Sequence, residues 1–174
     1  MIPVKLRMMN FMCYRDEEID FESSDIWCLC GENGAGKSTI LDAITWSLWG
    51  RARVEQDELI HKGQREMMVL FMFENKGQRY KVVRRREKGG RTSLLLSLIT
   101  RDGERKLSTG VREAESRIKK IIGMDYDTFI NSSFILQNRA DEFTKRTSKE
   151  RKDILFRILN LEKYEKAEEK AKEK

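Results

Sequence analysis

Residues 31–39 read GENGAGKST, and this stretch decides the fold class of the chain. It fits the phosphate-binding pattern G-x-x-x-x-G-K-[ST] at every defined position. The preceding residues 25–30, DIWCLC, form a nearly continuous apolar run, which is typical of a buried central strand. The following residues 38–50, STILDAITWSLWG, carry apolar side chains at helical spacing and end at a glycine. A strand, a glycine-rich loop and a helix in this order predict a P-loop in an α/β fold.

The residue types of the loop suit a nucleotide phosphate. Glycines allow main-chain N–H groups to turn toward phosphate oxygens, and the N-terminus of the next helix adds partial positive charge. We therefore expect ATP and Mg²⁺ as cofactors. Lys37 is expected to reach the β- and γ-phosphates and to be catalytic, Ser38 to ligate Mg²⁺, and Thr39 to reach the α-phosphate. The whole expected binding set of the loop is Asn33, Gly34, Ala35, Gly36, Lys37, Ser38 and Thr39.

The segments around the P-loop predict a sheet and further helices. Alternating apolar residues favour strands near residues 2–8 and 19–21, and further strands at 67–74, 78–86 and 92–107. Asn75-Lys76-Gly77 predicts a hairpin turn between two of these, and Asp102-Gly103 predicts another turn. Residues 111–122 and 125–136 are expected to be helical. The predicted architecture is a mixed sheet with the P-loop helix packed on it, a β-hairpin region, a small helical subdomain and a protruding C-terminal helix.

Charge is high and unevenly distributed. The formal net charge is +6, the pI is about 9.2, and 37% of residues are charged, against an average of about 25% for globular domains. Most residues of 145–174 are charged, which favours a solvent-exposed helix such as the start of a coiled coil. The positive charge is consistent with a polyanionic partner. Three cysteines, two of them in a C-x-C inside an apolar run, fit buried free thiols in a reducing cytosol better than a disulfide framework. No apolar run is long enough to cross a membrane.

A P-loop hydrolyses ATP only together with an acidic Mg²⁺ partner on a neighbouring strand. Glu74 and Asp102 each follow apolar residues, but both lead into tight turns rather than ending a buried strand. We therefore expect the acidic motif to be absent from this chain and to lie on another part of the polypeptide or on another chain.

Several segments resemble one family of P-loop ATPases. A strand ending in Asn10-Phe11, the P-loop near residue 31 and LDAI at 41–44 resemble the SMC-like, ABC-type ATPases of double-strand-break repair, SbcC and Rad50. Further similar segments are LIHKG at 59–63, FILQ at 134–137 and RILNLEKY at 157–164. The resemblance implies an ABC-type or SMC head N-terminal lobe at residues 1–146 and the start of a coiled-coil helix at 147–174. The acidic and signature motifs would belong to the C-terminal lobe of the same ATPase.

The resemblance also implies further site residues. Gln137 would be the Q-loop glutamine, contacting Mg²⁺ and the attacking water. Ile60, His61 and Lys62 would approach the nucleotide, although His61 could equally be a surface loop residue. The family commonly has Arg-Ser after Asn-Phe, whereas this chain has Met12-Cys13. Contact with the adenine would therefore come from the main chain of Met12 or from Arg15.

A cluster of basic residues lies on the predicted hairpin. It could be a solvated strand edge that resists aggregation, or it could contact the DNA backbone without sequence preference. The residues of this set are Lys81, Arg84, Arg85, Arg86, Lys88 and Arg91.

The resemblance leads to one functional hypothesis. The chain would be the ATP-binding half of a DNA double-strand-break repair ATPase in the cytoplasm, associated with the nucleoid, or in the nucleus of a eukaryote. It would dimerise with a second head on ATP, bind DNA ends and regulate a nuclease of the Mre11/SbcD type, and alone it would hydrolyse ATP poorly. The main alternative is an SMC-type chromosome-organising head, which a hinge in place of a zinc hook in the coiled coil would favour. An ABC transporter nucleotide-binding protein and a small P-loop kinase are further alternatives.

Overall fold

The computed structural model describes residues 1–24, 26–132 and 147–152. The chain divides into two compact units, Met1–Ile122 and Gly123–Lys174. The first unit contains the sheet and the P-loop segment, and the described residues of the second form short helical pieces.

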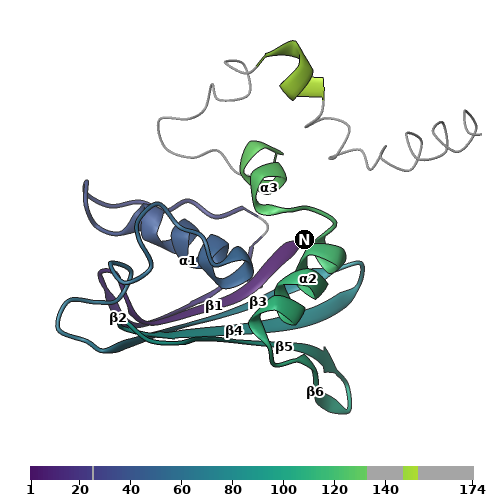
Figure 1. The fold of residues 1–174 in the computed structure, drawn as a ribbon, viewed down its shortest axis with the longest axis horizontal. Helices are drawn as coiled ribbons and strands as arrows, with labels where there is room; N and C mark the ends of the chain where they lie inside the picture. The colour runs from purple at the N-terminus through teal and green to yellow at the C-terminus, as the bar shows by residue number, and fades with distance from the viewer. Residues whose placement is uncertain (25, 133–146, 153–174) are drawn as a thin grey trace, which may run out of the picture. The chain divides into compact units, whose positions relative to one another are not determined.

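One antiparallel sheet of six strands forms the base of the first unit (Figure 1). Its spatial order is β2-β1-β3-β4-β5-β6, and every pair of neighbours is antiparallel. The strands are β1 (Ile2–Phe11), β2 (Tyr14–Asp20), β3 (Glu66–Asn75), β4 (Gln78–Glu87), β5 (Thr92–Thr100) and β6 (Gly103–Ser108). The α/β fold class is confirmed, but the sheet of the described residues is antiparallel rather than mixed. Four of the five neighbouring pairs are hairpins of consecutive strands, and β1 and β3, which are joined through the long segment that carries α1, are also antiparallel.

Both turns that the sequence predicts are present. Asn75 pairs with Gln78, which leaves Lys76 and Gly77 as a two-residue loop with φ values of 52° and 74°. Two positive φ angles in such a loop are the mark of a type I′ turn, whose twist matches that of the strands. At the β5–β6 hairpin Gly103 has a φ of 124°, again in the region that favours glycine.

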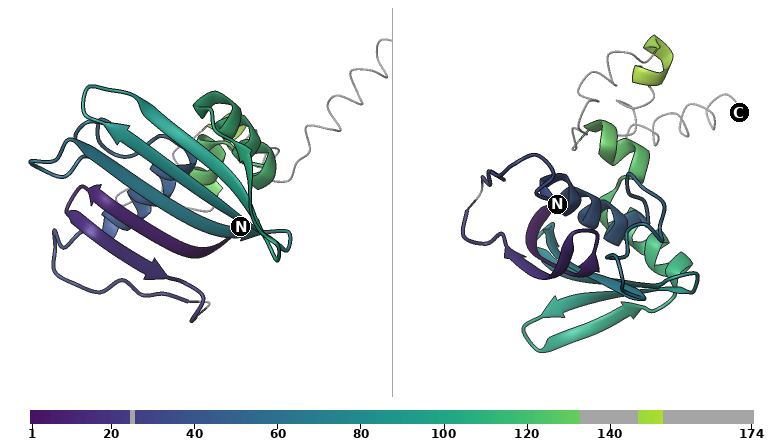
Figure 2. Two further views of the ribbon diagram at one scale, coloured as in Figure 1. Left: turned by 90° about the horizontal axis from the view of Figure 1, so that it is seen from below. Right: turned by 90° about the vertical axis from the view of Figure 1, so that its left-hand side faces the viewer.

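Two helices cover one face of the sheet (Figure 2). α1 (Lys37–Trp49) packs against β1, β3 and β4, and α2 (Val111–Ile122) packs against β5 and β6. α1 ends as predicted at Gly50, which has a φ of 66° and donates its N–H to the carbonyl of Trp46. The helical spacing of the apolar residues in 38–50 predicts one buried face that includes Leu41; Trp46 is fully buried, but Leu41 is 36% exposed. The fully buried core includes Leu6, Met8, Phe11, Ala43, Trp46, Val69, Phe71, Phe73, Val82, Leu96, Ala114 and Ile118.

The segment before the glycine-rich loop is not the buried central strand that its sequence predicts. Residues 26–30 belong to none of the described strands. Ile26 is 86% exposed, Trp27 44% and Leu29 37%. A strand is stable in the interior only when neighbouring strands satisfy its N–H and C=O groups. The described residues of the first unit supply no such neighbour, so the apolar side chains remain at the surface.

The described part of the second unit contains α3 (Tyr126–Ser132) and a helical turn at residues 148–152. Asp125 caps α3, since its carboxylate accepts a hydrogen bond from the N–H of Thr128. Thr147 and Glu150 form a reciprocal capping box, with the N–H of each residue donating to the other side chain. A helix therefore begins after Thr147, where the sequence predicts one. None of the helices in the described ranges is long and apolar enough to span a membrane.

Candidate nucleotide-binding site

The glycines of the loop occupy backbone conformations that other residues rarely adopt. Gly31, Gly34 and Gly36 have φ values of 152°, 89° and 94°. At Gly36 a side chain is excluded for a second reason, because a Cβ atom there would lie 2.5 Å from the Sγ of Cys13. The loop that leads into α1 therefore requires glycine at these positions, which are glycine or unrestricted in the phosphate-binding pattern.

Lys37 is the first residue of α1, and its side chain folds back over the loop. Its Nζ donates to the carbonyl oxygens of Gly31 and Glu32, both at 2.7 Å. The loop thus surrounds a positive charge at the N-terminus of a 13-residue helix. Both features favour an anion at this place.

The β1–β2 turn supports the start of α1. The hydroxyl of Tyr14 donates to the carbonyl of Gly36 at 3.3 Å, and the Sγ of Cys13 lies 4.0 Å from Oγ1 of Thr39. Thr39 is 4% exposed. Burial raises the pKa of Tyr14, so its phenol stays protonated and remains a donor. This turn fixes the second half of the loop to the antiparallel sheet.

A second segment joins the same turn. Met12 donates its N–H to the carbonyl of Leu59 at 2.7 Å, and His61 donates its N–H to the carbonyl of Asn10 at 2.8 Å. Phe11 and Ile60 form an isolated bridge between the two stretches. Nδ1 of His61 lies 2.6 Å from the carbonyl of Met12. A carbonyl only accepts, so Nδ1 carries a proton, and Nε2 of a neutral His61 is free to accept.

The structure therefore brings most of the expected nucleotide-binding residues into one region. Met12, Ile60 and His61 contact the turn that carries Cys13 and Tyr14, and this turn contacts the P-loop. Ser38 is the second residue of α1, Lys62 is exposed beside His61, and Asn33, Gly34 and Ala35 belong to the exposed first part of the loop. Gln137 lies outside the described residues.

Two carboxylates that sequence reasoning missed hold residues 51–58 in place. Asp42 is 4% exposed and forms an ion pair with Arg53 at 2.6 Å. Asp57 accepts hydrogen bonds from the guanidinium of Arg86 and the N–H of Gly89, and both contacts hold the pKa of Asp57 below its ordinary value. Asp42 lies on the same face of α1 as the buried Thr39 and Trp46, because the three positions are separated by three and four residues. A charged residue on a buried face is expected to have a partner of opposite charge. Its partner on a loop was not predictable from local sequence.

The basic set on the hairpin separates into two groups. Arg84 is 2% exposed, donates to the carbonyls of Ser47 and Leu48, and pairs with Glu115 at 2.9 Å. It is thus a structural residue, which corrects its assignment to the DNA-binding set. Lys81 pairs with Glu104, and Arg86 pairs with Asp57. The remaining members are Arg85, Lys88 and Arg91, whose side chains have no ion pair with any described residue.

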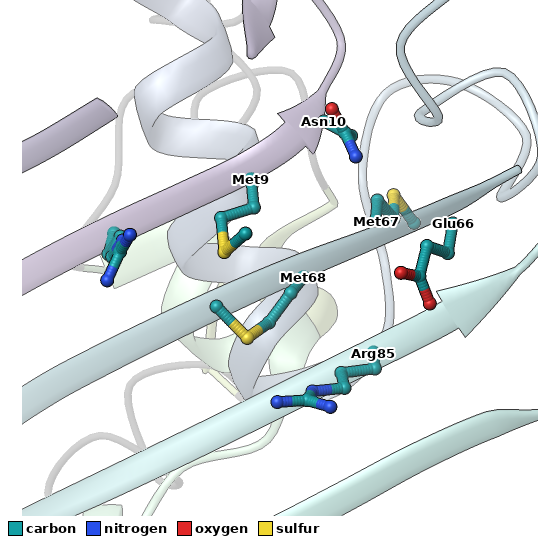
Figure 3. A pocket seen from close by; sticks show the side chains of 7 residues that line it. Met9, Asn10, Glu66, Met67, Met68 and Arg85 are labelled. Atoms are coloured by element: carbon teal, nitrogen blue, oxygen red, sulfur yellow. The ribbon is translucent and has the colours of Figure 1, made fainter. Parts of the chain in front are cut away.

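A separate pocket of about 410 Å³ opens at the ends of three strands, away from the glycine-rich loop (Figure 3). Met9, Met68 and Arg85 lie in one row across β1, β3 and β4 because they are register partners. The pocket is lined by Arg7, Met9, Asn10, Glu66, Met67, Met68 and Arg85. It contains no glycine loop and no helix N-terminus, so the P-loop remains the place where the structure favours phosphate.

Comparison with known proteins agrees with the geometry of the loop. The profile of a family described as "AAA domain" matches residues 5–174. The chain is 34% identical to the "DNA double-strand break repair Rad50 ATPase" of Thermoplasma volcanium, over 95% of this chain and 18% of that protein. It is 31% identical to the SbcC protein of the nuclease SbcCD of Deinococcus radiodurans, over 92% of this chain and 19% of that protein. The chain thus spans about a fifth of the length of the curated relatives that it matches.

One solved structure is similar over nearly the whole chain. It is described as "Structural biochemistry of ATP-driven dimerization and DNA stimulated activation of SMC ATPases". The TM-score is 0.67 and the identity 25%, and the match covers 91% of this chain and 99% of the other.

Proposed function

This chain belongs to the AAA domain family, in the group that includes Rad50 and SbcC, and from this membership we propose that it is the ATP-binding lobe of a DNA double-strand-break repair ATPase. The observation that carries the proposal is the P-loop itself. Three loop glycines have positive φ angles, and a lysine closes over them at the start of α1. This combination provides N–H groups, a helix N-terminus and an ammonium group for one polyphosphate.

Different residues of the chain would contact different parts of ATP. Lys37 would exchange its two loop carbonyls for the β- and γ-phosphate oxygens, since charge-assisted contacts to phosphate are the stronger ones. Thr39 would face the α-phosphate from its place beside Cys13. The turn at Met12, together with Ile60, His61 and Lys62, would adjoin the base and ribose. In this arrangement Nε2 of His61 is an acceptor for a ribose hydroxyl or a bound water.

The described residues fit Mg²⁺ as an ion shared with the nucleotide. No group of three or more His, Cys, Asp or Glu side chains in the described part of the chain could hold a metal alone. Mg²⁺ commonly binds through one or two protein oxygens, several waters and the substrate phosphates. The hydroxyl of Ser38, one residue after Lys37, and Gln137 would be the protein ligands, and the ion would neutralise charge on the phosphates.

The surface around the P-loop suits a second lobe of the same ATPase. Ile26, Trp27 and Leu29 are exposed before the loop, and Leu41 is exposed on α1. Large apolar side chains that gather at a surface commonly mark an interface. We propose that residues 26–30 become a strand when the C-terminal lobe supplies neighbouring strands, and that this lobe also brings the acidic motif. Without it, ATP hydrolysis by the chain is expected to be poor.

The names of the relatives support a cycle on DNA. In this cycle two heads dimerise on ATP, and hydrolysis separates them and controls a nuclease of the Mre11/SbcD type. DNA would be held through phosphate contacts of Arg85, Lys88 and Arg91, the members of the basic set that form no ion pair with a described residue. Each phosphate contact that is lost should reduce the slope of log affinity against log salt by about 0.9.

The test uses the full-length protein and two lysine variants. Lys37→Ala should abolish ATP-dependent dimerisation, measured by light scattering with and without Mg·ATP, because the variant loses the ammonium group at the phosphates. Lys106→Ala, an exposed lysine on β6, is the matched control and should dimerise like the wild type. Undiminished dimerisation of Lys37→Ala would refute the assignment.

A further inference from the structure

Two thiols lie side by side immediately before the P-loop. The Sγ atoms of Cys28 and Cys30 are 3.4 Å apart, and both residues are exposed, whereas the sequence predicts buried thiols. They are exposed because residues 26–30 are not in the sheet. Gly31, the first glycine of the loop, follows Cys30 directly. The pair therefore lies within the segment that is expected to become a strand but is not one in this structure.

A bond between these sulfurs is geometrically incompatible with a strand. Residues i and i+2 of an extended strand place their side chains on one face, with Cα atoms about 6.6 Å apart and parallel Cα–Cβ bonds. A disulfide requires Cβ atoms only about 3.5 to 4.5 Å apart. Joining Cys28 to Cys30 thus demands a bent backbone, and the non-strand conformation of residues 26–30 already holds the sulfurs close together.

We propose that Cys28 and Cys30 form a reversible disulfide that keeps residues 26–30 out of the strand and weakens ATP binding at the adjoining P-loop. The inference rests on the proposed function, because it assumes that this loop binds ATP. A P-loop is competent when it runs from a strand into a helix. The helical side of the loop is held by Tyr14 and Cys13, whereas its strand side carries the thiol pair. Oxidation would therefore act on the half of the loop that the sheet does not fix.

The oxidant is a low-molecular-weight disulfide. One protein thiolate, for example that of Cys28, attacks a sulfur of the small disulfide and releases one small thiolate. The thiolate of Cys30 then attacks Sγ of Cys28 and releases the second small thiolate. The two protons of the protein thiols pass to the two leaving thiolates. The net result is one protein disulfide and two small thiols, and an excess of small thiol reverses it.

The experiment measures ATP affinity of the full-length protein in glutathione buffers of increasing oxidised fraction. Mass spectrometry of peptides maps the cysteine pair in the same samples. We expect the Cys28–Cys30 disulfide to appear together with a loss of ATP affinity of about tenfold or more, because a competent loop is then rarely populated. Excess reductant should restore both signals.

Three variants separate this switch from other thiol chemistry. Cys28→Ser and Cys30→Ser should each have the same ATP affinity in reducing and oxidising buffer. Cys13→Ser should keep the ratio between the two conditions, since Cys13 contacts Gly36 and Thr39 but is not part of the pair. Loss of redox sensitivity in Cys13→Ser would overturn the proposal. The proposal would also fail if the oxidised protein, with the Cys28–Cys30 disulfide mapped, bound ATP as tightly as the reduced protein. A reduced protein that binds no ATP would instead overturn the proposed function, and this inference with it.

Discussion

Arg84→Met is expected to destabilise the first unit more than the same change at any other member of the basic set on the hairpin. Arg84 lies on β4 with 2% exposure, and its guanidinium bridges the last turn of α1 and the side chain of Glu115 on α2. Its Cζ also lies 5.8 Å from the ring centroid of Trp46. One side chain thus joins the sheet to both helices.

The magnitude follows from the three contacts of the guanidinium. It donates to the carbonyl of Ser47 at 3.1 Å, to that of Leu48 at 3.4 Å and to Glu115 at 2.9 Å. Hydrogen bonds of a charged group contribute about 1.5 to 3 kcal/mol each, but removing the arginine also removes the cost of burying its charge. That cost is visible as a pKa of Arg84 that burial lowers from its ordinary value. Methionine keeps the apolar stem, so a net loss of about 2 to 4 kcal/mol is expected.

Urea denaturation followed by far-UV circular dichroism and tryptophan fluorescence measures this loss. Arg85→Met is the matched control, since Arg85 is the next residue on β4, points to the other face and is exposed. The control should change the free energy of unfolding by less than about 0.5 kcal/mol. Equal effects of the two variants would show that Arg84 does not connect the helices to the sheet. Glu115→Gln should cost about 1 kcal/mol at most, because Glu115 is 37% exposed and its ion pair is screened.

Three further outcomes are expected. Gly36→Ala should abolish ATP binding measured by calorimetry, because its Cβ would lie 2.5 Å from Cys13 Sγ and because the φ of residue 36 is 94°. The double variant Gly36→Ala with Cys13→Ala should still bind ATP poorly, since it relieves the clash with Cys13 but not the backbone strain. The stabilisation from Asp57 should be complete above pH of about 5 and fall as pH drops through its lowered folded pKa, because Arg86 favours the carboxylate. Asp57→Asn should lose that pH dependence in acid-denaturation curves, and an unchanged curve would contradict it. His61→Gln should weaken ATP binding less than Lys37→Ala in the same titration, and an equal loss would mean that His61 contacts phosphate.

Local patterns in the sequence were sufficient wherever local forces determine the structure. The Asn75-Lys76-Gly77 turn is set by residues that tolerate positive φ, and α1 ends where Gly50 can adopt a left-handed conformation. The capping box at Thr147 and Glu150 is likewise readable within four residues. These elements need no partner from elsewhere in the chain.

Predictions failed where the partner of a residue lies far away. An apolar run such as residues 26–30 indicates that burial is favourable, but not that the covering strands are present. The spacing of the arginines on β4 predicts one basic cluster, although period-two alternation places Arg84 on the same face as the buried Val82 and Tyr80. That alternation was a usable signal that Arg84 differs from Arg85. The carbonyls of α1 that it binds could not be deduced, because they depend on how α1 crosses the sheet.

The two wrong predictions, the strand at residues 26–30 and the role of Arg84, concern the P-loop before α1 and the C-terminal end of α1. The C-terminal end of α1 is held by Arg84, and the N-terminal end by Tyr14 and Cys13, so the antiparallel sheet positions α1 and the second half of the P-loop by itself. The first half of the loop depends on residues 26–30, which the sheet does not bind. On the proposal that residues 26–30 become a strand, completing the strand and completing the phosphate site would be one event. Any factor that adds neighbouring strands should raise ATP affinity, and by linkage ATP should tighten the binding of that factor.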